Sequence, residues 1–212
     1  MVRLLLIPAL PLTLLFAAVI GVIQARPYQN DSLDALLAPP AGCPAPCWQG
    51  IRPGVTRVGE AIDLLEAHPW IDHIIITESF GATGSGFVGW AWSGKQPAPI
   101  DGRFRGAMWV NDDVVQSVRI PTTISFGALW LRFNRPPKGS FRLALDAQAM
   151  DHVILHFAAY PDYKFVAWNE VICPLSLHDF WSATMSIQFT DALSRELGDY
   201  RLPGWTHESP CA

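Results

Sequence analysis

Eight short apolar runs, rich in Val, Ile, Phe and Trp, constrain the fold of this chain more than any other feature. Each run has the length of a strand, and turn-forming Gly, Pro, Asn and Asp residues separate the runs. This pattern favours antiparallel sheet with tight turns over a helical bundle. The predicted strands are 71–77, 87–92, 104–110, 114–120, 141–145, 152–159, 163–168 and 183–189.

Two segments between these runs have a helical pattern. Apolar residues recur every three to four positions from Val58 to Leu65, which predicts a helix with Thr56 as its N-cap. Ser125 is placed to cap a second, shorter helix that runs to Phe133. Each helix precedes four predicted strands. The expected fold class is therefore α+β, with two tandem helix-plus-antiparallel-sheet units that arose by internal duplication.

The first 26 residues are predicted to direct export. An apolar run from Leu4 to Ile23 follows a single Arg3, and at 1.5 Å per residue it would reach about 30 Å, the thickness of a bilayer core. One alternative is an uncleaved signal anchor that forms a transmembrane helix, and the other is a signal peptide cleaved after Ala25. The length of the run favours the anchor. Both alternatives place the rest of the chain outside the cytoplasm, single-pass in the first case and secreted in the second.

The remaining chain divides into three predicted parts. Residues 27–42, rich in Pro and Ala, are expected to be a linker. Residues 43–120 and 121–212 are the two expected helix-plus-sheet units, packed as one compact domain. A net charge of -4 and a pI near 5.8 argue against nucleic acid as a partner.

The segment I-R-P-G-V-T-x-x-x-E-A-I-x-L-L, from Ile51 to Leu65, and the Asn-Asp-Asp hairpin that follows resemble a known family. They are similar to the opening of the small outer-membrane assembly lipoproteins of the SmpA/OmlA kind, whose fold is shared with β-lactamase-inhibitor proteins. The chain also resembles uncharacterised exported bacterial proteins with a C-W-x-G-I-x-P-G motif. The resemblance covers about residues 47–120. It implies two helices on an antiparallel sheet, and a role in binding proteins without catalysis.

The four cysteines are candidates for disulfide bonds. Cys43, Cys47, Cys173 and Cys211 all follow the predicted export segment, and an oxidising compartment favours disulfides. Three pairings are possible. Either Cys43 pairs with Cys47 and Cys173 with Cys211, or longer bridges join the first pair to the second.

Aromatic and histidine residues give two competing functional hypotheses. Trp90, Trp92 and Trp109 are candidates for an exposed aromatic binding surface. His152 and His156 are spaced so that a strand would place both imidazoles on one face, and they could serve an exported hydrolase or a metal-dependent enzyme.

No cofactor is expected. Glycines between Gly84 and Gln96 match phosphate-loop spacings, but Pro97-Ala98-Pro99 follows them and cannot begin the helix that such a loop needs. The sequence also lacks the H-E-x-x-H and G-x-S-x-G motifs. The favoured prediction is a non-catalytic extracytoplasmic binding or envelope-assembly module. Its expected partners are the membrane, through the N-terminal helix, and an envelope protein.

Overall fold

The computed structural model describes residues 11–21, 30–76, 85–145, 152–174, 176–190, 192 and 197–202. The chain divides into two compact units, Met1–Asn30 and Asp31–Ala212. In the first unit, residues 11–21 form a helix. None of the helices in the described part of the chain combines the length and the apolar character needed to cross a membrane. The predicted transmembrane helix is thus wrong for the residues that the structure describes.

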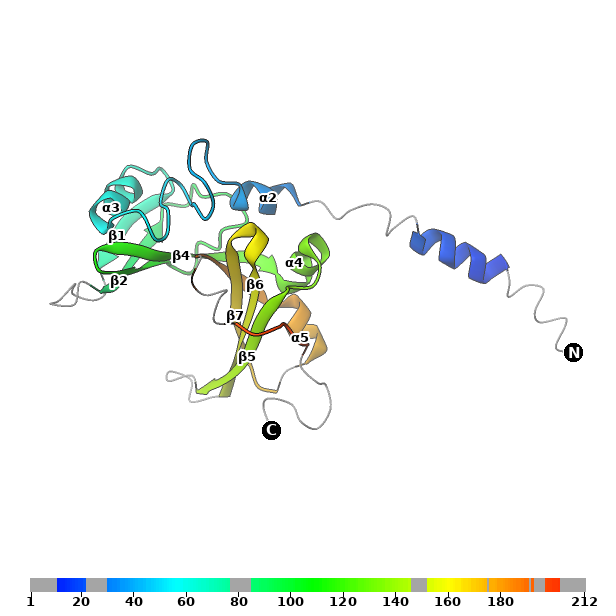
Figure 1. Cartoon of the computed structure of the whole chain (residues 1–212). Coiled ribbons are helices and arrows are strands. Elements are labelled where there is room, and N and C mark those ends of the chain that lie inside the picture. The colour runs from blue at the N-terminus through cyan, green and yellow to red at the C-terminus, as the bar shows by residue number, and fades with distance from the viewer. Residues whose placement is uncertain are drawn as a thin grey trace, which may run out of the picture. The chain divides into compact units, whose positions relative to one another are not determined.

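All eight strands described in the second unit belong to one antiparallel sheet (Figure 1). Their order across the sheet is β1-β2-β3-β4-β8-β7-β6-β5. In Figure 1, β1, β2 and β4 run across the view, whereas β5, β6 and β7 run upright, so the sheet is strongly twisted. The strands are β1 (Ile71–Ile76), β2 (Gly86–Trp92), β3 (Gly106–Asn111), β4 (Val114–Ser125), β5 (Lys138–Leu145), β6 (His152–Tyr160), β7 (Phe165–Ile172) and β8 (Thr184–Phe189).

The predicted fold class, with two tandem helix-plus-antiparallel-sheet units, is wrong because β4 pairs with β8. Arg119 on β4 lies opposite Gln188 on β8, in the middle of the sheet. In two separate units, β4 and β8 would each be an edge strand with a row of unpaired N–H and C=O groups. Pairing these two edges satisfies both rows of backbone groups and joins the strands into one continuous antiparallel sheet.

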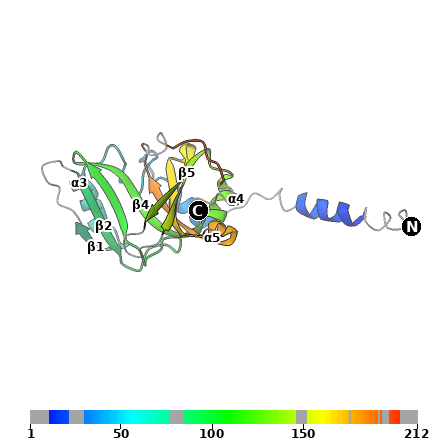
Figure 2. The same cartoon turned by 90° about the horizontal axis from the view of Figure 1, so that it is seen from below.

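The helices described in the second unit pack on one face of this sheet, which we call the covered face. Their buried side chains join those of alternate strand residues in a single core cluster, since side chains on a strand point to opposite faces in turn. Figure 2 shows α3 beside β1 and β2, with α4 and α5 toward the other end. The helices are α2 (Asp31–Leu37), α3 (Val58–Glu66), α4 (Phe126–Phe133) and α5 (Leu177–Ser182).

Part of the predicted linker is folded into the domain. Within residues 27–42, α2 buries Leu33 and Leu36 in the core, because their spacing places both on one side of a helix. Arg132 of α4 donates a hydrogen bond from Nε to Asp34, at 2.9 Å. The domain therefore begins before the first cysteine.

Candidate functional site

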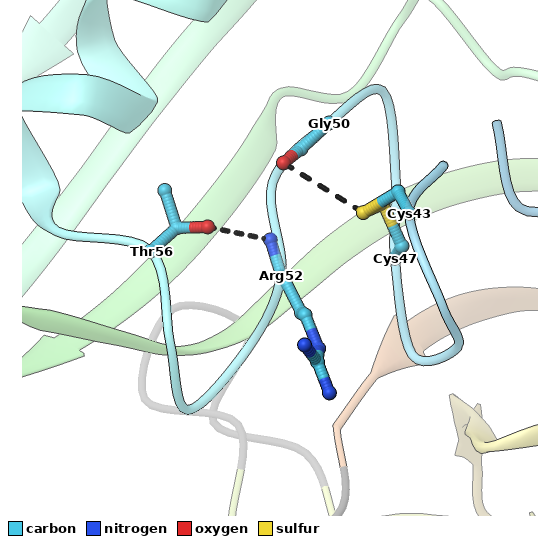
Figure 3. Close-up of a disulfide and its surroundings, with 5 residues drawn as sticks. All are labelled: Cys43, Cys47, Gly50, Arg52 and Thr56. Atoms are coloured by element: carbon cyan, nitrogen blue, oxygen red, sulfur yellow. Dashed lines mark hydrogen bonds between the residues drawn. A yellow bond between two sulfur atoms is a disulfide. The ribbon is translucent and has the colours of Figure 1, made fainter. Parts of the chain in front are cut away.

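The loop that enters the domain is closed by a disulfide between Cys43 and Cys47 (Figure 3). This bond confirms the short pairing and excludes long bridges from either residue. Cys173 is also disulfide-bonded, and Cys211 lies outside the described residues. The Sγ atom of Cys43 is 3.9 Å from the carbonyl oxygen of Gly50, a contact without a donor because a disulfide sulfur carries no hydrogen.

The turn after this loop differs from the prediction in one detail. Thr56 does not cap α3, whose N-cap is Arg57. Instead, the Thr56 hydroxyl accepts a hydrogen bond from the backbone N–H of Arg52 at 2.8 Å, and Figure 3 shows the Arg52 side chain pointing away from that turn. The N–H of Gly54 donates to the carbonyl of Val115 on β4, at 2.7 Å. The loop is thereby held against the start of β4.

The face of the sheet opposite the helices, which we call the open face, bears partly exposed aromatic residues. Phe87 on β2 lies directly opposite Trp109 on β3, with their ring centroids 4.5 Å apart. Phe87 remains 45% exposed. Farther across the face, Trp168 on β7 lies opposite Phe157 on β6. These rings line a surface that the described helices leave uncovered.

Three depressions meet on the open face and form one groove, which we call the β4 groove. The central depression, about 470 Å³, includes Gln116, Arg119 and Trp168 in its lining. A second, about 380 Å³, lies beside the disulfide loop and shares Gln116 with the first. A third, about 330 Å³, shares Arg119 and Trp168 and extends to Thr122. From Gln116 to Thr122 the groove follows β4 for about 20 Å, at 3.3 Å per residue.

Arg119 lies at the centre of this groove. The Cζ atom of its guanidinium is 5.4 Å from the centre of the Trp168 ring, a cation–π geometry. Burial lowers the pKa of Arg119, and the nearby carboxylate of Glu170 acts in the opposite direction. Among the described residues, Arg119 has no ion-pair or hydrogen-bond partner. The guanidinium is therefore half desolvated and still able to bind an anion.

The charged residues of the β4 groove differ in sign from the chain as a whole. The chain has 19 acidic and 15 basic residues, yet Glu170 is the one acidic residue in the described lining. This surplus of positive charge creates a local field that attracts anions. The basic residues of the lining are Arg52, Arg105, Arg119 and Lys164.

Two of the three predicted surface tryptophans lie on the covered face. Trp90 is fully buried and stacks on Trp48, with centroids 5.6 Å apart. A Cβ atom on Gly106 would overlap the Trp90 indole, so glycine is needed there. Trp92 is half-buried and donates from Nε1 to the carbonyl of Phe104 at 2.8 Å. Both share the strand parity of the buried core. The predicted surface position is wrong for Trp90, whereas Trp92 remains partly accessible on the covered face. Of the three, Trp109 alone lines the groove.

His152 and His156 do not form the predicted catalytic or metal site. His156 is buried between Phe141 and Phe180, at 4.5 and 5.2 Å, and its Nε2 is 2.9 Å from the Tyr200 hydroxyl. Burial lowers the pKa of His156 to about 3, and the adjacent Asn169 side chain opposes this change. The imidazole is neutral at pH 7 and belongs to the core. His152 is exposed.

No set of three or more His, Cys, Asp or Glu side chains in the described part of the chain is placed to hold a metal ion. Asp151, which directly precedes His152 in the sequence, lies outside the described residues. The arrangement on the open face instead provides rings, amides, hydroxyls and guanidinium groups, which are suited to binding.

The segment 197–202 limits the open face at its β5–β6 end. Leu197 packs there on Ala159 and Val166. The N–H of Gly139 donates to the carbonyl of Gly198 at 2.9 Å, and Tyr200 then reaches the core on the covered face. A Cβ atom on Gly139 would overlap the Tyr200 ring. The described part of this segment leaves the β4 groove open.

Sequence reasoning missed Phe87, Arg119 and Trp168. A signal was present for Arg119, since a cation in an apolar strand marks the face that is not core. Phe87 and Trp168 gave no such signal, because aromatic residues are common on both faces of a sheet.

Comparisons of the chain with protein-family models, with curated proteins and with solved structures found no match. The resemblance to the SmpA/OmlA lipoproteins therefore stays a prediction. The fold and the groove define a structural class: a twisted antiparallel sheet with helices on one face and a basic, aromatic groove on the other.

Proposed function

We propose that this protein is a non-catalytic binding module that holds a partner protein in the β4 groove. The observation that supports this most is the contrast between the faces, since the helices pack on one face and the other exposes Phe87, Trp109 and Arg119. Trp, Phe and Arg are enriched in protein interfaces and dominate their binding energy. Besides small and apolar residues, the described lining includes aromatic, amide, hydroxyl and basic side chains and one carboxylate, Glu170, a composition that suits recognition.

We further propose that the module works outside the cytoplasm, in the cell envelope. The disulfide between Cys43 and Cys47 and the disulfide-bonded Cys173 support this location, because such bonds persist in oxidising compartments. The apolar run at the start of the chain supports it as well.

Photo-crosslinking in the cells that make the protein tests this function. The full-length chain carries p-benzoylphenylalanine in place of Phe87, and a control chain carries it in place of Leu131, which is 63% exposed on α4. We expect one discrete protein adduct from position 87, lost when Trp109→Ala is added, and none from position 131. Equal adducts from both positions, or none from position 87, would contradict the proposal.

A further inference from the structure

We propose that the partner binds through an extended acidic segment of about six residues, one carboxylate of which is held by Arg119. This inference rests on the function proposed above and adds the chemistry of the partner. It follows from the charge of the β4 groove, the state of Arg119, the length of the groove and the way its indole rings are covered.

Charge complementarity predicts that the partner segment is negatively charged. Basic residues lie at both ends and at the centre of the groove, with Arg52 beside the disulfide loop, Arg119 in the middle and Arg105 at the far end. A neutral segment would cover Arg119 further with only the nearby carboxylate of Glu170 to offset its charge, which disfavours binding. An acidic segment supplies the missing charge along the whole groove.

The state of Arg119 points to a carboxylate. Trp168 holds the planar guanidinium in place by contact with its ring, and a fixed guanidinium fork matches a carboxylate with two parallel hydrogen bonds. The indole Nε1 of Trp168 is buried and has no hydrogen-bond partner among the described residues. The Arg119 guanidinium is therefore the donor that the centre of the groove presents to a ligand, since the buried Nε1 of Trp168 is not accessible.

The shape and lining of the groove favour an extended polypeptide. Its course of about 20 Å along β4 matches about six residues of extended chain. The Gln188 amide lines the central depression and can donate to and accept from a peptide backbone, whereas Asn111 and Gln116 in the same lining already donate within the chain. Phe87 and Trp109 offer apolar area for the side chains between the acidic ones.

An anionic glycan fits this surface less well. Sugar rings stack on exposed aromatic faces, but Trp168 already contacts Arg119 at 5.4 Å and stacks with Phe157 at 6.2 Å. The Trp109 ring is in contact with Phe87. With these faces engaged, the groove offers edges, amides and charges in preference to a stacking platform.

Binding of short probes to the purified full-length chain tests the inference. The probe is the blocked hexapeptide acetyl-Glu-Val-Glu-Val-Glu-Val-amide, and its matched control has Gln in place of Glu. Trigalacturonate, which also carries three carboxylates, serves as the glycan arm. Titrations followed by NMR or calorimetry give the Kd, and unfolding midpoints verify that each variant is folded.

We expect the acidic hexapeptide to bind more tightly than the Gln peptide and than trigalacturonate. Arg119→Gln should weaken this binding at least about tenfold, with Arg119→Lys in between. The matched control is Arg142→Gln, since Arg142 also lies over a ring, 5.8 Å from Phe157, but lines none of the three depressions. It should change the Kd less than about twofold. Raising the salt from about 0.02 M to about 0.2 M should weaken binding.

The inference is overturned if the acidic peptide does not bind, if the Gln peptide binds equally, if Arg119→Gln has no effect, or if trigalacturonate binds more tightly. The crosslinking experiment separates this failure from failure of the proposed function. If the adduct at position 87 persists in Arg119→Gln, the proposed protein-binding function stands, and the inference that the partner binds through an acidic segment is wrong.

Discussion

The two faces of the sheet are both rich in aromatic residues, but they differ in whether a charged side chain without an ion-pair partner in the described part of the chain lies among the rings. On the covered face, His156 is enclosed by aromatic rings and shares a hydrogen bond with Tyr200. On the open face, Arg119 lies on Trp168 with no ion-pair or hydrogen-bond partner in the described structure. Aromatic content therefore does not distinguish core from binding surface in this protein. The charged Arg119 guanidinium does distinguish them, because complete burial of that group requires a counterion from a binding partner.

The largest expected change in stability comes from a core residue on the covered face. Trp90→Ala on the covered face should reduce the free energy of unfolding by about 3–5 kcal/mol, because it leaves a large cavity beneath Trp48. Urea unfolding followed by circular dichroism measures this change. A loss below about 1 kcal/mol would mean that the core collapses around the missing ring.

Acid should lower the free energy of unfolding, because His156 on the covered face is buried in its neutral form. His156 is neutral when folded, with a pKa of about 3, and has an ordinary pKa near 6.5 when unfolded. Stability is therefore fully present above pH 6.5 and falls with decreasing pH by up to about 1.4 kcal/mol per unit. Between pH 7 and pH 5 the loss should be about 2 kcal/mol by urea unfolding.

His156→Phe provides the control for this pH effect. The variant lacks the hydrogen bond to Tyr200 and so loses stability at both pH values, but the difference between pH 7 and pH 5 should largely disappear. An unchanged difference would assign the acid sensitivity to another group.

The disulfide between Cys43 and Cys47 should stabilise the fold by a similar amount. Cys43→Ala together with Cys47→Ala opens a five-residue loop, with a sequence separation of 4, and the chain-entropy model gives a loss of about 2 kcal/mol. Trp48 directly follows this loop, so its fluorescence should report the transition. An unchanged unfolding midpoint would show that packing of Trp48 alone holds the segment.

The smallest expected effect on stability lies on the open face. Trp109→Ala should cost no more than about 1 kcal/mol, because the ring is partly exposed and packs mainly on Phe87. The same variant should abolish the crosslinked adduct at position 87. A loss as large as that of Trp90→Ala would place Trp109 in the core and weaken the contrast between the faces.

Features that depend on neighbouring residues were predictable from the sequence. Ser125 caps α4, with its Oγ accepting a hydrogen bond from the N–H of Ala128 at 3.2 Å, as its position predicts. The Asn-Asp-Asp turn joins β3 to β4, and Asp112 and Asp113 both adopt the left-handed backbone that such a turn requires. These features follow from interactions within a few residues of chain.

The tertiary structure decided what the faces of the sheet contain. Pairing of β4 with β8 joins residues as distant as Arg119 and Gln188, and no local pattern specifies which edges will meet. The same pairing brings Arg119 to Trp168 on β7 and creates the groove. The sequence by itself thus determined the Asn-Asp-Asp turn, the Ser125 cap and the approximate strand positions, whereas the fold determined which tryptophans are core and which arginine is available to a partner. The physical reason is that burial and charge pairing depend on contacts across the sheet.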